Sequence, residues 1–141
     1  MSPERHVEVS LRTAGKEQVL DVSSELNRRL PEIGVEDGAV LVYCPHTTAA
    51  ITVNESADPD VSADITQGLA AMVPGIRFRH AEGNSPAHLR AALLGPSLVL
   101  PVQHGKLKLG TWQGIYFCEF DGPRSRSLWL FPLGSVSAPG R

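Results

Sequence analysis

Three histidines in unusual local sequence are the residues best suited to chemistry. His46 lies in the segment Cys-Pro-His-Thr-Thr-Ala-Ala, and His80 and His88 bracket Ala-Glu-Gly-Asn-Ser-Pro-Ala. Imidazole is the commonest metal ligand and is readily tuned to carry protons near neutral pH. If the three rings converge, they would hold a zinc ion with one position open for water or substrate. The alternative is that each histidine is a hydrogen-bonded structural residue, because their spacing matches no zinc-finger pattern.

Acidic residues and one arginine supply candidates for catalysis. Asp60 and Asp64 stand four apart in a predicted helix and share a face, where a divalent cation or a basic substrate would relieve their repulsion. An ordinary acidic helix start explains Asp58 and Asp60 at least as well. Glu119 falls on an apolar strand face and therefore needs an exposed strand end or a partner, for which Arg124 is the nearest candidate. Arg124 would either complete a structural ion pair or hold a phosphate through its bidentate fork. We predict catalytic roles for Glu119, Asp64 and Arg124.

The segment 46–55 predicts a strand with one polar face. Alternation places Thr47, Ala49, Ile51 and Val53 on a core face, and the opposite face carries His46, Thr48, Ala50, Thr52 and Asn54. The polar face contains neither Lys nor Glu, which usually dominate solvent-facing strands. We therefore interpret it as the wall of a site, the alternative being a face that simply meets water.

A glycine-bracketed turn adds a second group of candidates. The sequence Gly-Thr-Trp-Gln-Gly at 110–114 can bring backbone N–H groups close to an anion while Trp112 offers a stacking face. The alternative is a tight β-turn with a buried Trp. The predicted substrate-binding residues are Thr47, Thr48, Asn54, Asn84, Trp112 and Gln113.

Several of these motifs resemble the hallmark segments of the YjbQ-like family. The resemblance spans nearly the whole chain and is carried, in order, by 46–55, 57–61, 82–85, 87–88, 109–115 and 119–124. It implies an α+β fold, a homotrimer, and a secondary, slow thiamine-phosphate synthase activity. That reaction joins a pyrimidine carrying a pyrophosphate leaving group to a phosphorylated thiazole, and magnesium is the usual partner of pyrophosphate. Three alternatives remain open: a metal-dependent hydrolase of a phosphorylated small molecule, a metal- or small-anion-binding protein, and a structural oligomer.

Size and composition limit the class of protein. The 141 residues are enough for one domain, 1–141, with a real core; 42% are hydrophobic, 20% are charged and the net charge is −2. Lys and Arg are scattered, which argues against a nucleic-acid or anionic-membrane binder. No apolar run approaches the roughly 20 residues that span a bilayer, so we predict a cytoplasmic protein. The partner that the family resemblance implies is a small phosphorylated molecule. Cys44 and Cys118 read as small buried hydrophobes.

Strands predominate at both ends of the chain, and helices lie in the middle. Helices are predicted from Ser23, from Asp58-Pro59 and from Asn84-Ser85-Pro86. Besides 46–55, strands are predicted near 7–11, 19–22, 39–43, 76–80, 98–102, 106–109, 115–120 and 127–131. This order predicts an α+β fold with a largely antiparallel β-sandwich core and about three short helices. Residues 134–141 read as a loose tail.

Overall fold

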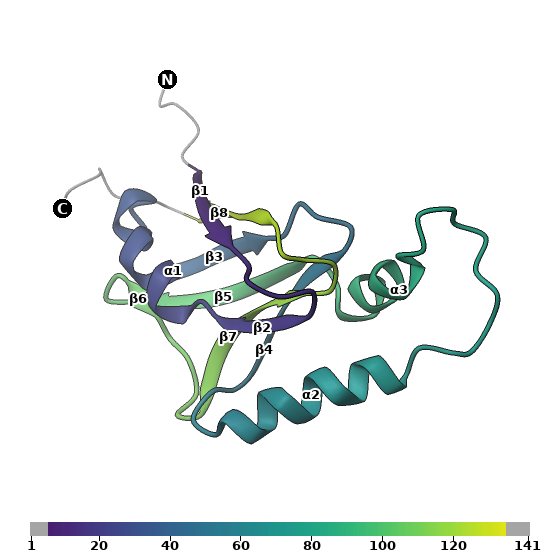
Figure 1. Cartoon of the computed structure of the whole chain (residues 1–141). Coiled ribbons are helices and arrows are strands. Elements are labelled where there is room, and N and C mark those ends of the chain that lie inside the picture. The colour runs from purple at the N-terminus through teal and green to yellow at the C-terminus, as the bar shows by residue number, and fades with distance from the viewer. Residues whose placement is uncertain (1–5, 135–141) are drawn as a thin grey trace.

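The computed structural model describes residues 6–134 and confirms the α+β class (Figure 1). Its strands are β1 (Val7–Arg12), β2 (Gln18–Asp21), β3 (Gly38–Tyr43), β4 (Ala49–Glu55), β5 (Ser97–Gln103), β6 (Lys106–Leu107), β7 (Gln113–Glu119) and β8 (Ser125–Leu133). Its helices are α1 (Ser23–Arg29), α2 (Pro59–Ala71) and α3 (Ser85–Leu94), with a 3-10 turn, η1, at Leu30–Glu32. Beyond Gly134, the predicted tail lies outside the described residues.

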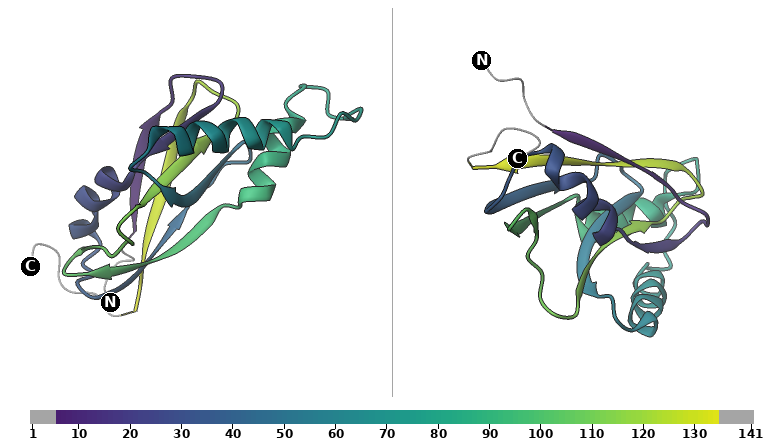
Figure 2. Two further views of the ribbon diagram at one scale, coloured as in Figure 1. Left: turned by 90° about the horizontal axis from the view of Figure 1, so that it is seen from below. Right: turned by 90° about the vertical axis from the view of Figure 1, so that its left-hand side faces the viewer.

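The strands form two curled antiparallel sheets. One has the order β1-β8-β3-β5-β6 and the other β2-β7-β4. In the second sheet Ala49 stands opposite Glu119, and Glu55 opposite Gln113, so the start of β4 adjoins the end of β7. Figure 2 shows the helices at the periphery of these sheets, with α2 running along the outside.

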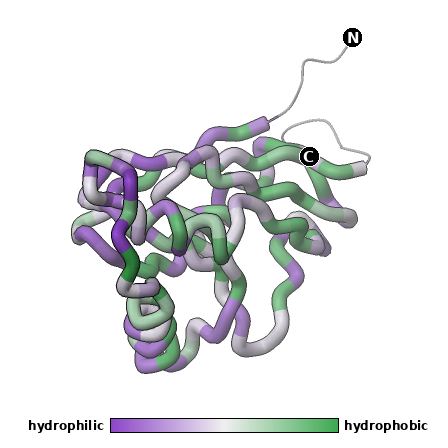
Figure 3. The backbone as a smooth tube through the Cα atoms, turned by 90° about the vertical axis from the view of Figure 1, so that its right-hand side faces the viewer, coloured by the Kyte–Doolittle hydropathy of each residue, from purple (hydrophilic) through white to green (hydrophobic). Residues whose placement is uncertain are grey.

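Two hydrophobic clusters hold the fold together. The larger lies between the sheets and includes Ile51, Phe117 and Leu130, with Leu26 of α1 closing it. The smaller joins the outer face of β4 and β7 to α2 and α3. Along the strands, hydrophobic and hydrophilic segments alternate, as expected where the two sides of a strand meet different surroundings (Figure 3).

The predicted strand at 46–55 begins three residues later than expected, at Ala49. Its core face is confirmed for Ala49, Ile51 and Val53, which pack in the larger cluster. The other face is the predicted polar wall only in part: His46 and Thr48 line a polar cavity, whereas Ala50 packs into the smaller cluster beneath the helices and Asn54 is exposed. The alternation was right, but the helices cover this face at Ala50.

Of the predicted helix caps, only that of α2 forms a side-chain hydrogen bond; α1 and α3 begin without one. Asp58 accepts a hydrogen bond from the Asp60 N–H at 2.9 Å at the start of α2, and proline follows each cap of α2 and α3 at the first or second helical position. The predicted strand at 76–80 is wrong: no regular element forms between α2 and α3. That segment extends beyond the sheets in both views and so finds no strand to pair with (Figures 1 and 2).

Both cysteines are packing residues, as predicted. Cys44 and Cys118 are buried and unbridged, and burial raises the pKa of their thiols to about 11 and about 12. Both thiols therefore stay protonated and unreactive near neutral pH. No helix within residues 6–134 has the length and apolar character to cross a membrane.

Candidate functional site

A polar cavity of about 400 Å³ lies where the two sheets meet the first turn of α3. Three parts of the chain contribute to it: the segment before β4, the turn into β8, and the end of the projecting segment with the start of α3. It is lined by Pro45, His46, Thr47, Thr48, His80, Glu82, Asn84, His88, Arg124 and Arg126. The three predicted histidines therefore share one cavity with Thr47, Thr48, Asn84 and Arg124.

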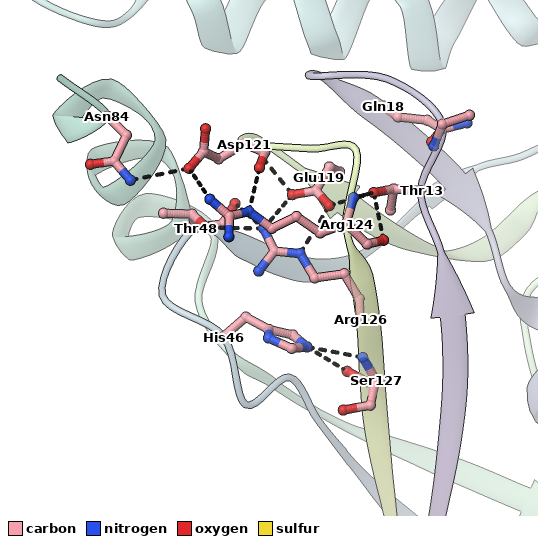
Figure 4. A network of polar contacts seen from close by, with 11 residues as sticks. Thr13, Gln18, His46, Thr48, Asn84, Glu119, Asp121, Arg124, Arg126 and Ser127 are labelled. Atoms are coloured by element: carbon pink, nitrogen blue, oxygen red, sulfur yellow. Dashed lines mark hydrogen bonds and ion pairs between the residues drawn. The ribbon is translucent and has the colours of Figure 1, made fainter. Parts of the chain in front are cut away.

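An ion pair between Glu119 and Arg126 lies buried beneath this cavity (Figure 4). Arg126 contacts Glu119 Oε1 through Nε at 2.9 Å and Oε2 through Nη2. The same carboxylate accepts from the Thr13 hydroxyl at 2.7 Å and the Asp121 N–H at 3.1 Å. Nη2 of Arg126 also donates to Thr48 Oγ1 at 2.9 Å. Both charges are thus paired and hydrogen-bonded, as burial requires.

The predicted pairing of Glu119 with Arg124 is wrong. Burial by itself would raise the pKa of Glu119, but hydrogen bonds from Arg126, Thr13 and the Asp121 N–H outweigh it and lower that pKa. Glu119 is therefore a charged group with no exposed surface. It does not line the cavity, and its geometry is that of a positioning residue for Arg126.

Arg124 is instead held by Asp121. Its Nε donates to the Asp121 carbonyl at 2.7 Å and its Nη2 to Oδ2 at 3.0 Å. Asp121 Oδ2 also accepts from Asn84 Nδ2 at 3.1 Å, and the hydrogen bonds from Asn84 and Arg124 lower the pKa of Asp121. Asn84 Oδ1 is buried without a partner among the described residues. Asn84 thus ties the start of α3 to the arginine turn, and makes no side-chain cap of its own helix.

One nitrogen of each cavity arginine is left free for a ligand. Hydrogen bonds among the described residues engage Nε and Nη2 of Arg124 and of Arg126. In Figure 4 the remaining nitrogen of each guanidinium carries no dashed line. Two guanidinium groups at one cavity are a recurrent way of binding phosphate.

His46 is an uncharged ring anchored to β8. Its Nε2 lies 3.0 Å from the Ser127 nitrogen and 3.1 Å from the Ser127 oxygen. Burial, followed by the positive charge of Arg126, lowers the pKa of His46. The ring is therefore neutral near pH ~7, and the Ser127 backbone already engages one of its nitrogens.

The histidines do not form a ready three-ligand metal site. The rings of His80 and His88 are edge to face with centroids 5.4 Å apart, and His80 Nε2 is 3.9 Å from Glu82 Oε1. Within residues 6–134, no three His, Cys, Asp or Glu side chains are grouped so as to hold a metal ion. Zinc ligation by His46, His80 and His88 stays a prediction.

Four predicted site residues lie away from this cavity. Asn54 pairs with Gly114 at the far end of β4, about 20 Å along the strand from the histidine end. Trp112 and Gln113 belong to the same far end; Trp112 is largely exposed, so the buried-Trp alternative is wrong. The Gly110 turn forms as predicted, but Gln113 Oε1 accepts from its N–H at 2.8 Å. Asp64 is exposed on α2 and does not line the cavity.

Comparison with known proteins identifies the family of this chain. The family described as "UPF0047 protein YjbQ-like" matches residues 7–135. UPF0047 protein YugU of Bacillus subtilis is 44% identical over 89% of this chain and 97% of its own length. The chain belongs to the YjbQ-like family. UPF0047 protein YjbQ of Salmonella typhimurium is 37% identical over 86% of this chain and 91% of its own length.

Solved structures of YjbQ-like proteins share the fold. An uncharacterized conserved protein of this family from Clostridium acetobutylicum is 50% identical, with a TM-score of 0.82 over 88% of this chain and 97% of that one. The hypothetical protein APE1520 of Aeropyrum pernix is 41% identical, with a TM-score of 0.84 over 92% and 98%.

Two lining residues of this YjbQ-like site escaped the sequence reasoning. Arg126 stands two residues after Arg124 and pairs with Glu119. The apolar strand face around Glu119 indicated only that a cationic side chain lies nearby, and not which one. Strand alternation at the start of β8 is the signal that could have found it, because Arg126 alternates with Ser125 and Ser127 toward the interior. Glu82 was quoted only as part of a motif, and its exposed carboxylate lies at the rim with His80.

Proposed function

We propose that the polar cavity binds the phosphate of a small phosphorylated molecule, as the substrate site of a transferase of the thiamine-phosphate synthase type. The observation that carries this proposal is the pair of guanidinium groups at one cavity, each with Nη1 left free by the described residues. The transferase chemistry is what the family resemblance implies. The phosphate site is what the geometry supports.

The two arginines contribute in different ways. Arg126 is nearly inaccessible and fixed by Glu119 and Thr48, so it meets a ligand without losing side-chain freedom on binding. Arg124 is about half exposed and can adjust to the ligand while Asp121 holds its Nε and Nη2. A rigid guanidinium beside an adaptable one can donate hydrogen bonds to different oxygens of the same phosphoryl group.

Charge in the cavity favours an anion. The acids closest to the arginines, Glu119 and Asp121, are already committed to hydrogen bonds and do not line the cavity. Glu82 does line it, but its side chain is 74% exposed at the rim.

For pyrophosphate departure, the chain's own residues supply positive charge and position. The free guanidinium nitrogens of Arg124 and Arg126 would stabilise negative charge that grows on the leaving group. Thr47 and Thr48 line the same cavity and offer polar contacts for orientation. Magnesium accompanying the pyrophosphate stays a prediction and would add further charge compensation.

Hydrolysis of a phosphate ester is the second candidate. It is favoured by the imidazoles of His80 and His88, which lie together beside Glu82 at the mouth of the cavity. Such a group can activate water by taking its proton.

One assay distinguishes these activities. The purified protein is incubated with magnesium, the pyrimidine pyrophosphate and the thiazole phosphate, and the products are separated. Release of pyrophosphate with formation of thiamine phosphate supports the transferase, whereas inorganic phosphate alone supports the hydrolase. We expect His88→Ala to abolish either product while near-UV and far-UV circular dichroism stay unchanged. Full turnover by His88→Ala would contradict its assignment to the site.

Assembly and location remain predictions. The family resemblance implies a homotrimer, and the sequence itself predicts a cytoplasmic location. Light scattering at micromolar concentration tests the assembly, and a monomer would contradict it.

A further inference from the structure

A second cavity, of about 320 Å³, adjoins the polar one. The two share His46, Thr47 and His88, so a ligand seated between these residues reaches both. The remaining wall of the second cavity is formed by Ala49, Ala91, Ala92 and Pro96.

The character of this wall is apolar. None of the residues that complete it carries a charge, and three of them are alanines. Two of its backbone acceptors are also engaged: the Pro96 carbonyl accepts from the Cys44 N–H at 2.7 Å and the Ala91 carbonyl from the Gly95 N–H at 2.9 Å. A polar group placed against this wall would lose water and meet no polar side chain of the wall, whereas an apolar group would gain burial.

The residues shared by the two cavities lie where the polar and apolar parts of one ligand would join. His46 presents a planar ring held in place by the Ser127 backbone and set edge-on to Phe117, with centroids 6.2 Å apart. His88 comes from the first turn of α3 and Ala91 and Ala92 from later in the same helix, so one helix spans both cavities. The arginines lie only on the polar side.

We infer that the ligand of this site is a phosphate monoester of a small organic group, with an uncharged, ring-sized part in the Ala-walled cavity. This inference rests on the proposed phosphate site. The volume of about 320 Å³ lies at the lower end of the roughly 300–1,000 Å³ typical of ligand pockets and is ample for a single ring. Continuity through His46, Thr47 and His88 identifies the occupant of the apolar cavity as part of the same ligand.

Three probes test the inference by calorimetric titration: inorganic phosphate, methyl phosphate and phenyl phosphate. We expect phenyl phosphate to bind about tenfold more tightly than methyl phosphate, because its ring is removed from water. Ala92→Leu should remove that preference by filling the cavity, and leave methyl phosphate affinity within about twofold. Leucine is a good helix former, so α3 should persist.

Ala63→Leu is the matched control, because Ala63 is also an exposed helical alanine but lines neither cavity. It should keep the wild-type preference for phenyl phosphate. Equal affinity for methyl and phenyl phosphate in the wild type would overturn the inference and leave the phosphate site standing. A preference that survives Ala92→Leu would also overturn it. Binding of none of the three probes would reject the proposed function, and the inference with it.

Discussion

Two arginine–acid pairs stand two residues apart in the chain and lie in opposite environments. In the Glu119–Arg126 pair the side chains are 0% and 6% exposed, whereas in the Asp121–Arg124 pair they are 18% and 53% exposed. Both arginines reach the same cavity. From this difference we expect the buried pair to matter most for stability and for the geometry of the site, and the exposed pair to matter most for the response to a ligand.

The physical reason is solvation. A buried ion pair depends on its partners for every hydrogen bond, so removing one member strands a charge in the interior. An exposed pair regains water when it is broken and contributes little to folding. Loss of the guanidinium should therefore have very different effects at Arg126 and at Arg124.

The largest effect is expected from Arg126→Leu. It leaves Glu119 charged and buried with only Thr13 and the Asp121 N–H as donors, which should cost about 3–5 kcal/mol of unfolding free energy. Urea denaturation measures it. Glu119→Gln combined with Arg126→Leu should recover part of the loss, because no charge is then stranded. A loss below about 1 kcal/mol for the single variant would contradict the importance of the buried pair.

The position of the cavity could be predicted from the sequence better than the ion pairs around it. The motifs around His46 and around 80–88 pointed to one site, and the structure brings all three histidines to one cavity. The partner of Glu119 could not be chosen between Arg124 and Arg126, because a two-residue difference after a turn decides which side chain enters the interior.

Other expectations failed for a longer-range reason. Asn54 and Trp112 belong to motifs that look like parts of the same site, but the antiparallel pairing of β4 with β7 places them at the opposite end of the strands. The polar face predicted for 46–55 is interrupted at Ala50, because α2 and α3 pack over it there. The local alternation of polar and apolar residues predicts neither result, because each depends on how elements distant in the sequence pack together.

A smaller effect is expected from Gly122→Ala, in the turn between the two pairs. An added Cβ would lie 2.4 Å from the Gly15 carbonyl oxygen and 2.8 Å from Glu119 Cγ and Thr13 Oγ1. Relieving these contacts should cost about 1–3 kcal/mol, measured by urea denaturation. Gly68→Ala in α2 is the control; nothing lies within 4 Å of its Cβ, so it should be neutral or stabilising. Equal stability of both variants would argue against a tightly packed turn.

The buried pair should also produce a defined pH dependence. The pKa of Glu119 is lowered from its usual 4.5, so its contribution to stability is complete above that value and is lost as pH falls through the folded-state pKa. Unfolding free energy measured between pH 7 and pH 3 should fall more for the wild type than for the Glu119→Gln/Arg126→Leu variant. Parallel curves would show that Glu119 does not titrate as the geometry requires.

The smallest effect on stability is expected from Arg124→Gln. The Asp121 pair is exposed on the arginine side, so its loss should change the unfolding free energy by less than about 1 kcal/mol. Thermal unfolding compared with Arg77→Gln, an exposed arginine outside both cavities, provides the reference. A loss as large as that of Arg126→Leu would erase the distinction between the two pairs.

Titration of inorganic phosphate into the wild type, Arg124→Gln and Arg77→Gln tests the phosphate site most directly. The wild type and Arg77→Gln should bind phosphate equally, whereas Arg124→Gln should bind about tenfold or more weakly, since a charge-assisted contact contributes about 1.5–3 kcal/mol. Arg124→Lys should fall between them because it keeps the charge and loses the fork. Wild-type phosphate affinity in a folded Arg124→Gln protein would contradict the account.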